Sequence, residues 1–401
     1  MEKSFISVLI PTKDRAELLG AAIRSCLVQN YDDCQFIVSD NASSDHTRDV
    51  VHGFNDPRLR YVNPGRRLSM ADNFEFALSH AAPGYVLSIG DDDALMPDAL
   101  EYLGVLVGET AARAIAGPLN FYHWDNQPID ALRNTLYLCL GSGFTVKNSR
   151  KEVRRTLGFN YSYVHKLPGI YYGLISTRLV EKLSCNGRFF HSMTPDAYSA
   201  LACALATEDF VYSHKPFILA GVSGRSTGAS QLSSTNSPEI SRFFQENTHK
   251  FHESLVYCPA QAMMIAEAFL QLRSIHPQLT EGIEFSIREM CTAALREANA
   301  NTRSAIETAV SEMSKRNGVS FEQLKKASRM PPVRALLSKE VDEFLLPHLF
   351  VQSSVSEIPD VAAAAVYADR VTRALVGRRN RNWANNFVQR ISRKLRARLV
   401  R

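Results

Sequence analysis

The sequence predicts an α/β protein with a doubly wound, mostly parallel sheet, followed by a helical C-terminal region. Strand-like and helix-like segments alternate over about the first 120 residues, which is typical of a sheet with helices on both faces. From about residue 237 to 338, apolar residues recur at helical spacing instead. The chain has 401 residues, 45 % apolar and 22 % charged, and this length favours two or three packed units.

The N-terminal elements follow from short apolar runs that end at turn residues. Expected strands are Phe5–Ile10, Gln35–Ser39, Leu59–Val62 and Tyr85–Ile89. Expected helices are the stretch through Leu18–Leu27, Asp45 to about Phe54, and Ala71–Ala81. Asp14 and Glu17 are spaced as in a capping box that would start the first helix. Further on, Phe210–Tyr212 resembles a strand, and Ala294–Met313 is expected to be an amphipathic stretch.

Charge and cysteine usage restrict the class of protein. Arg370–Arg401 holds eleven Lys and Arg and no acidic residue, although the whole chain carries only +5. Seven cysteines without a Cys-x-x-Cys pair argue against a zinc site and a disulfide framework, and favour a reducing cytosol. No transmembrane helix, signal peptide or nucleic-acid partner is expected.

The basic tail has an amphipathic pattern. Apolar residues between Asn385 and Val400 share one helical face, basic residues cover the remainder, and Trp383 precedes them. This pattern is typical of an interfacial helix, so we expect peripheral contact of residues 383–401 with the cytoplasmic face of a membrane. A helix packed on the acidic body, or on a second subunit of a homo-oligomer, is the alternative.

The clearest chemical signal is the triplet Asp91, Asp92 and Asp93 after the fourth expected strand. Ligands of doubly wound sheets lie at the carboxyl ends of the strands, where Thr12 and Asp40 are also expected. Adjacent carboxylates repel one another, and hard oxygen ligands suit Mn²⁺ or Mg²⁺ bridging to a phosphate. A solvated turn with a helix cap would give the same residues.

Four segments in order resemble the opening of family 2 glycosyltransferases. Ser7–Arg15 is similar to the pattern S-V-I-P-T-Y-N-R, and Ser25–Tyr31 to S-x-x-x-Q-x-Y. Val38–Thr47 is similar to V-D-D-G-S-x-D-x-T, and Gly84–Leu100 to G-x-Y-x-x-x-x-D-x-D-D-x-x-x-P-x-x-L. The chain departs at Asn41, usually a second Asp in this family.

This resemblance implies a GT-A-like fold, a nucleotide diphosphate-sugar donor and inverting sugar transfer. It places Pro11, Thr12 and Arg15 around the nucleotide and Asp40 on the base, commonly uracil. Asp91 would contact the ribose, while Asp92 and Asp93 would hold the metal against the diphosphate. A metal there would stabilise the departing diphosphate as a Lewis acid.

The acceptor hydroxyl must also lose a proton, which requires a general base. Asp196 is the expected base, because Thr194–Leu201 resembles the acidic motif E-D-x-x-L before a helix, with Pro195 in place of Glu. An ordinary acidic first turn is the alternative. The pair Glu208 and Asp209 is the fallback.

Two arginines and one aromatic stretch complete the candidates. Arg225 lies in a Gly- and Ser-rich loop that would close over a diphosphate or serve only as a linker, and Arg67 is a second phosphate candidate. Leu167–Gly173, with its two tyrosines, would form a platform for a sugar ring or be plain core. His123, His165 and His191 have no metal-ligand spacing.

These readings divide the chain into residues 1–120 for donor binding, 121–235 for acceptor binding, 236–369 as a helical region and 370–401 as the tail. The expected reaction is transfer of a sugar to a hydroxyl of a glycan or lipid-linked acceptor. Alternatives are a non-catalytic carbohydrate-binding scaffold and a sugar nucleotidyltransferase. An aspartyl-phosphate phosphohydrolase fits less well, because its acidic pair should follow the first strand.

The reaction expected from the sequence is therefore inverting transfer of a sugar from a nucleotide diphosphate-sugar, most simply a UDP-sugar, to a hydroxyl of a glycan or lipid-linked acceptor. The resemblance associates this reaction with the assembly of bacterial surface polysaccharides. A cytoplasmic location fits the cysteine usage, and the basic tail adds the hypothesis of attachment to the membrane face.

Overall fold

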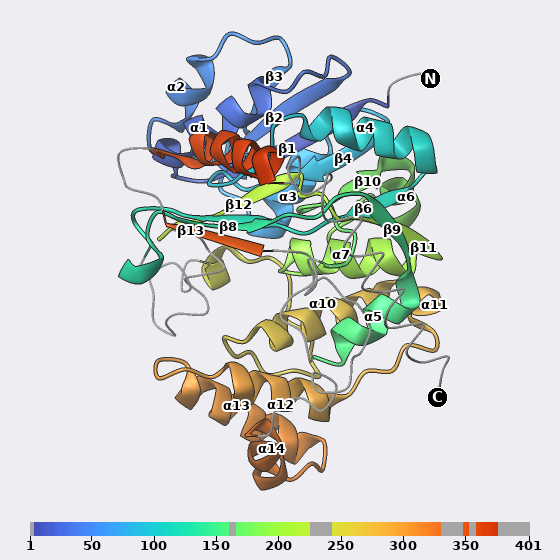
Figure 1. Cartoon of the computed structure of the whole chain (residues 1–401). Coiled ribbons are helices and arrows are strands. Elements are labelled where there is room, and N and C mark those ends of the chain that lie inside the picture. Colours follow the sequence, from blue (N-terminus) through green and yellow to red (C-terminus); the bar gives the residue numbers. More distant parts are fainter. Residues whose placement is uncertain are drawn as a thin grey trace, which may run out of the picture.

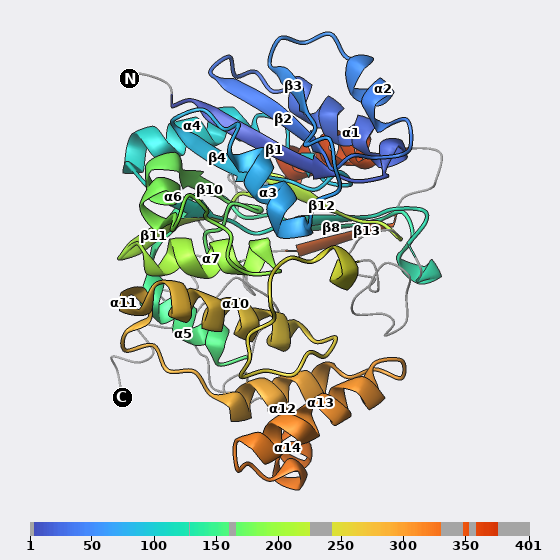
Figure 2. The same ribbon diagram turned by 180° about the vertical axis from the view of Figure 1, so that it is seen from behind.

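The computed structural model describes residues 4–127, 129–159, 166–224, 243–329, 348–352 and 358–375. Figure 1 shows a body built around sheets at one end and a group of helices, α12 to α14, at the other. Helix α7 lies between the larger sheet and α10 in both views (Figures 1 and 2). The described helices include none that is long and apolar enough to cross a bilayer.

Two sheets form the body. The larger sheet contains β1 (Ile6–Thr12), β2 (Cys34–Asp40), β3 (Leu59–Val62), β4 (Tyr85–Ser88), β6 (Ala114–Ala116), β9 (Phe144–Asn148), β10 (Leu174–Ser176) and β11 (Asp209–Ser213). The smaller sheet contains β5 (Ala94–Leu95), β7 (Asn120–His123), β8 (Thr135–Cys139), β12 (Ile218–Val222) and β13 (His348–Gln352).

The helices of the body are α1 (Ala16–Leu27), α2 (Thr47–His52), α3 (Met70–Leu78), α4 (Ala99–Thr110), α5 (Ser149–Leu157), α6 (Thr177–Leu183) and α7 (Pro195–Leu205), with one 3-10 turn, η1 (Asp130–Leu132). The helical region contains α10 (Gln261–Ile275), α11 (Pro277–Thr280), α12 (Ile287–Glu297), α13 (Arg303–Arg316) and α14 (Phe321–Ser328). Residues 361–375 form one more helix.

The larger sheet has the order β3-β2-β1-β4-β10-β6-β11-β9. Its first four strands are parallel, whereas β10 runs antiparallel to both β4 and β6. The chain therefore winds outward in both directions from β1, and the predicted α/β class with a GT-A-like, doubly wound sheet and a helical C-terminal region is confirmed. Thr12 pairs with Asp40 in the register of β1 and β2, so both strands end at one edge.

Alternate residues of β1 separate the core into two layers. Ile6, Val8 and Ile10 belong to the cluster that includes α1, α4 and the helix at 361–375. Leu9 belongs to the other cluster, with α3, α7 and the helical region. Successive strand residues point to opposite faces, and both sets are buried. This explains why Phe5–Ile10 is apolar at every position except Ser7.

The chain returns to the body after the helical region. Strand β13 pairs with β8, so the predicted region 236–369 is not helical throughout. The helix at 361–375 lies beside α1 in Figures 1 and 2, and its flanks form ion pairs from Asp360 to Arg24 and from Arg373 to Asp98. Residues far apart in sequence thus cover the second face of the sheet.

Two local predictions are wrong. Asp14 does not cap α1: its φ of 52° is left-handed, and its carboxylate accepts from the Ser44 backbone N–H instead. The Ala16 N–H at the start of α1 bonds to Asp45 from the next loop. The stretch Ala294–Met313 is two helices, because the Asn299 side chain accepts from the N–H groups of Asn301 and Thr302 and closes a turn.

Candidate active site

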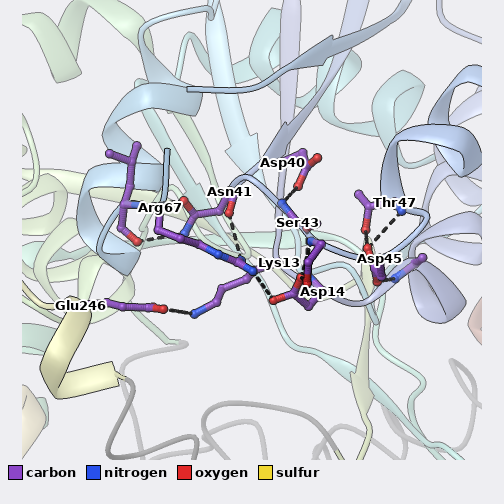
Figure 3. Close-up of polar contacts among 12 residues, drawn as sticks. Lys13, Asp14, Asp40, Asn41, Ser43, Asp45, Thr47, Arg67 and Glu246 are labelled. Carbon is purple, nitrogen blue, oxygen red and sulfur yellow. Dashed lines mark hydrogen bonds and ion pairs between the residues drawn. The ribbon is translucent and has the colours of Figure 1, made fainter. Parts of the chain in front are cut away.

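The loops after β1 and β2 meet at the carboxyl edge of the sheet (Figure 3). Arg67 joins them, because its guanidinium donates to Asp14 Oδ2 at 2.5 Å and to the Asn41 carbonyl at 3.0 Å. Lys13 forms an ion pair with Glu246, which lies between β12 and α10 along the chain. Arg67 is therefore at the predicted edge, and its guanidinium is paired with a carboxylate there.

Asp40 is 2 % exposed at the end of β2 and accepts three hydrogen bonds. The Ser43 N–H donates to Oδ1 at 2.9 Å, while the Tyr61 hydroxyl and the Asn63 amide donate to Oδ2 at 2.6 and 3.2 Å. Burial and the bond to Asp40 raise the pKa of Tyr61. No local sequence signal predicted Tyr61 or Asn63, since their chain positions carry no motif.

Asn41, the residue that departs from the family pattern, has a structural role. Its side-chain amide donates to the Leu68 carbonyl at 2.9 Å, and its side-chain oxygen accepts from the Leu68 N–H at 2.8 Å. These paired bonds fix the connection between β3 and α3. Asparagine at this position supplies both the acceptor and the donor for these bonds, whereas an ionised aspartate would lack the donor.

Asp91 joins the acidic triplet to the first loop. The Thr12 hydroxyl donates to Asp91 Oδ2 at 2.7 Å, and Arg15 donates to Oδ1 at 2.9 Å. Burial raises the pKa of Asp91 although the Arg15 charge opposes the rise. Burial alone would lower the pKa of Arg15, but the charges of Asp91 and Asp92 raise it. The structure thus brings Thr12, Arg15 and Asp91 together, as the sequence predicted.

Asp93 is fully buried and accepts four hydrogen bonds. Its Oδ2 accepts from the Gly90 N–H at 2.5 Å and from Tyr171 at 3.2 Å. Its Oδ1 accepts from the Gly221 N–H at 2.8 Å and from Tyr172 at 3.1 Å. Burial and the neighbouring charge of Asp92 raise the pKa of Asp93 to about 7.

The carboxylates of the triplet differ from one another in how well they could bind a metal ion. A carboxylate offers about four lone-pair positions, and the four donors around Asp93 use that number. Asp92 accepts from the Ser223 hydroxyl through Oδ2 at 2.7 Å and is 5 % exposed. Within the described ranges, no group of three His, Cys, Asp or Glu side chains is arranged to hold a metal. A cation there would depend on Asp92, on water and on a ligand phosphate.

Asp196 is the second residue of α7 and is partly exposed. Burial of its carboxyl raises its pKa to about 6. The same first turn contacts the strand that carries the triplet, because Ser199 Oγ accepts from the Ile170 N–H and the Ile170 carbonyl accepts from the Ser88 N–H. Segment 167–173 therefore links α7 to the end of β4.

The two tyrosines of that segment have a role that the sequence did not suggest. Tyr171 and Tyr172 stack with ring centroids 3.9 Å apart, and both hydroxyls donate to Asp93. They anchor the loop that carries Asp91, Asp92 and Asp93, called the acidic loop below. Burial raises the pKa of both hydroxyls. Two adjacent tyrosines were visible in the sequence, but their target on another strand was not.

The remaining candidates lie elsewhere. Glu208 and Asp209 are exposed beside β9, at the edge of the sheet opposite to β3. His123 contacts Thr135, and His191 contacts the Arg188 carbonyl. Arg225, His165 and the tail from 376 to 401 lie outside the described residues.

The parallel order of β3, β2, β1 and β4, with polar side chains gathered at their carboxyl edge, is that of an α/β domain of GT-A-like fold. Residues 7–160 match the family described as Glycosyl transferase family 2. The chain therefore contains a glycosyltransferase domain of family 2, and the resemblance stated from its motifs is confirmed over this segment.

Curated relatives match about a quarter of the chain. The GalNAc(5)-diNAcBac-PP-undecaprenol beta-1,3-glucosyltransferase of Campylobacter jejuni is 37 % identical over 101 residues, which cover 24 % of this chain and 33 % of that protein. The Escherichia coli UDP-Glc:alpha-D-GlcNAc-diphosphoundecaprenol beta-1,3-glucosyltransferase WfgD is 28 % identical over 101 residues, covering 25 % of this chain and 40 % of that protein. The match thus spans less than half the length of each relative.

Among solved structures, S. aureus TarS in complex with UDP-GlcNAc is similar to this chain with a TM-score of 0.47 and 12 % identity. That similarity covers 81 % of this chain and 90 % of the TarS chain.

Proposed function

We propose that the chain is an inverting glycosyltransferase that moves a sugar from a UDP-sugar to a hydroxyl of a lipid-linked glycan. The observation that supports it most directly is the meeting of Thr12, Arg15, Asp40 and Asp91 at the carboxyl edge of the family 2 domain. The names of the relatives from C. jejuni and E. coli support the choice of acceptor, since both act on glycans linked to undecaprenol diphosphate.

The nucleotide binds at this edge in the proposal. Asp40 accepts the N3–H of uracil while the Asn63 amide, already within 3.2 Å of Asp40, donates to a ring carbonyl. Asp91 accepts from the ribose, held in place by Thr12 and Arg15. Pro11 and Arg67 border the same pocket, and Arg225 is proposed as a further phosphate contact.

A divalent ion, Mn²⁺ or Mg²⁺, would be held by Asp92 and would neutralise the charge that develops on the leaving diphosphate. The donor count assigns Asp93 a different part from the one expected from the motif. Its four hydrogen bonds hold Gly90, Gly221 and the two tyrosines around the acidic loop. By fixing the loop in this way, Asp93 orients the neighbouring carboxylate of Asp92.

Asp196 is the proposed general base. At neutral pH a carboxyl with a pKa of about 6 is mostly ionised, yet is more basic than an ordinary aspartate. It removes the proton from the acceptor hydroxyl as the oxygen attacks the anomeric carbon from the face opposite to the diphosphate. The new glycosidic bond forms while the bond to the diphosphate breaks, so the configuration inverts.

Turnover with a panel of UDP-sugars tests this proposal. With Mn²⁺ and undecaprenyl diphosphate-linked N-acetylglucosamine, we expect UDP release that depends on both donor and acceptor. Asp92→Ala should abolish the Mn²⁺-dependent thermal shift by UDP, because a ligand stabilises only the state that binds it. Formation of UTP from pyrophosphate would point to nucleotidyl transfer instead, and sugar binding without turnover would point to a scaffold.

Membrane attachment is a separate part of the proposal. The basic tail, residues 383–401, would hold the enzyme near its lipid-linked acceptor at the cytoplasmic face. Co-sedimentation with anionic liposomes tests it by comparing the full chain with a chain that ends near Asp369. Equal pelleting of the two would exclude attachment through the tail.

A further inference from the structure

The helical region places a fully buried carboxylate against the start of α7. Glu267 lies on α10, outside the segment that matches family 2, and has an exposed fraction of 0 %. Its carboxylate accepts from the Ser192 hydroxyl and, at 2.8 Å, from the Gln271 amide. The His252 backbone also donates to it. All three donors are uncharged groups, so the carboxylate is held in the core by hydrogen bonds.

Ser192 connects Glu267 to the turn before α7 through hydrogen bonds. Its hydroxyl oxygen accepts from the Thr194 N–H at 3.2 Å and lies 3.1 Å from the Thr194 hydroxyl. Thr194 is the N-cap residue directly before α7, and its carbonyl accepts from the Tyr198 N–H at 3.0 Å. Asp196 is only two residues further along the chain.

Helix packing supports the same link. Four of the eleven residues of α7 are alanines, and α7 packs against α10 in the larger core cluster. Small side chains allow the two helices to approach closely, so a carboxylate on α10 reaches the turn that precedes α7. Figure 2 shows α10 running beneath α7 on the side away from the sheet.

We propose that Glu267 is a positioning residue for the general base, fixing through Ser192 and Thr194 the first turn of α7 that carries Asp196. This inference rests on the proposed function, because it assumes that Asp196 is the base. It gives the helical region a part in the reaction: α10 sets the orientation of a residue that lies in the body. Misplacement of a reacting group by about 1 Å is enough to lower a rate about 100-fold.

A buried carboxylate costs stability unless it is hydrogen-bonded, and an apolar side chain in its place could pack α10 against α7 equally well. A purely structural Glu267 would therefore affect stability and leave the rate per folded molecule unchanged. A positioning Glu267 affects kcat and the pH dependence that reports Asp196. These two roles predict different measurements.

The experiment compares Glu267→Ala, Glu267→Gln and Asp196→Asn in the full chain, with UDP-glucose, Mn²⁺ and undecaprenyl diphosphate-linked N-acetylglucosamine. We expect Glu267→Ala to lower kcat about 10- to 100-fold while the donor KM and the affinity for UDP stay near wild type. Glu267→Gln keeps an acceptor for Ser192 and should restore kcat to within about threefold of wild type. The acidic limb of the kcat profile should also shift in Glu267→Ala.

Glu297→Ala is the matched control. Glu297 is another carboxylate of the helical region, although its side chain is more exposed than that of Glu267. It accepts from the Gln261 and Ala262 N–H groups at the start of α10, away from Ser192. It should lose stability and keep kcat. If Glu267→Ala does not fold, Ser192→Ala removes the same link from its other end and should lower kcat in the same way.

The outcomes separate the two proposals. Normal kcat in Glu267→Ala, or equal slowing in Glu267→Ala and Glu297→Ala, overturns the positioning role while leaving the proposed function intact. If Asp196→Asn turns over normally, or the wild-type chain releases no UDP from any donor, the proposed function fails and the positioning role fails with it.

Discussion

Gly221 provides a sharp test of how the acidic loop is held. It lies on β12, and its N–H donates to Asp93 Oδ1 at 2.8 Å. A Cβ at this position would lie 1.7 Å from the Asp92 carbonyl oxygen and 2.8 Å from Trp124 Nε1. The absence of a side chain is therefore what lets β12 pass against the acidic loop.

The cost of Gly221→Ala follows from those distances. Real Cβ contacts stay above 3.0 Å, so β12 or the acidic loop must move by more than about 1 Å. Overpacking of this kind costs about 1–3 kcal/mol, and the lost hydrogen bond to a buried carboxylate costs about 1.5–3 kcal/mol. We expect the free energy of unfolding to fall by about 2.5–6 kcal/mol.

Urea denaturation and UDP titration of the same preparations measure the effect. Gly20→Ala is the control, because its Cβ would make ordinary contacts at 3.6 Å inside α1 and should be neutral or slightly stabilising. UDP binding in the presence of Mn²⁺ should weaken in Gly221→Ala and not in the control. Wild-type stability and UDP affinity in Gly221→Ala would refute the close approach of β12 to the triplet.

Two further predictions concern titrating groups. Asp196→Asn should lower kcat by about 10²- to 10⁴-fold and leave UDP affinity unchanged; in wild type, kcat should fall about tenfold per pH unit below the Asp196 pKa of about 6. Weakened UDP binding in Asp196→Asn would contradict the role as base. Burial raises the pKa of Glu297 to about 7, so its contribution to stability is present below about pH 4 and is lost as the pH rises through 7. The urea midpoint should therefore decline less between pH 5 and 8 in Glu297→Gln than in wild type.

The sequence predicted the N-terminal body well because its signals are local. The strand predicted at Leu59–Val62 has those bounds, and Tyr85–Ile89 differs from β4 by one residue. The cap expected from Asp14 was wrong, because the Ala16 N–H at the start of α1 is satisfied by Asp45 from the loop after β2. Capping by a distant residue leaves no trace in local spacing.

In the C-terminal part, too, contacts between residues far apart in the sequence could not be predicted from local patterns. Residues 348–352 form a strand only because β8 offers an edge for pairing, and their assignment to a helical region could not anticipate that partner. Glu267 likewise has an unremarkable place in a helical sequence. Its contact with Ser192 depends on how α10 crosses α7.

The sequence by itself determined the order of the first strands and helices, the family 2 domain and the position of Thr12, Asp40 and the acidic triplet along the chain. These features depend on apolar periodicity and on motifs whose residues are close in sequence. The tertiary structure decided which carboxylates differ in role: Asp91 pairs with Arg15, whereas Asp93 is saturated by donors from three segments. Adjacent aspartates are chemically identical in a sequence, and only the donors and the burial supplied by the fold distinguish them.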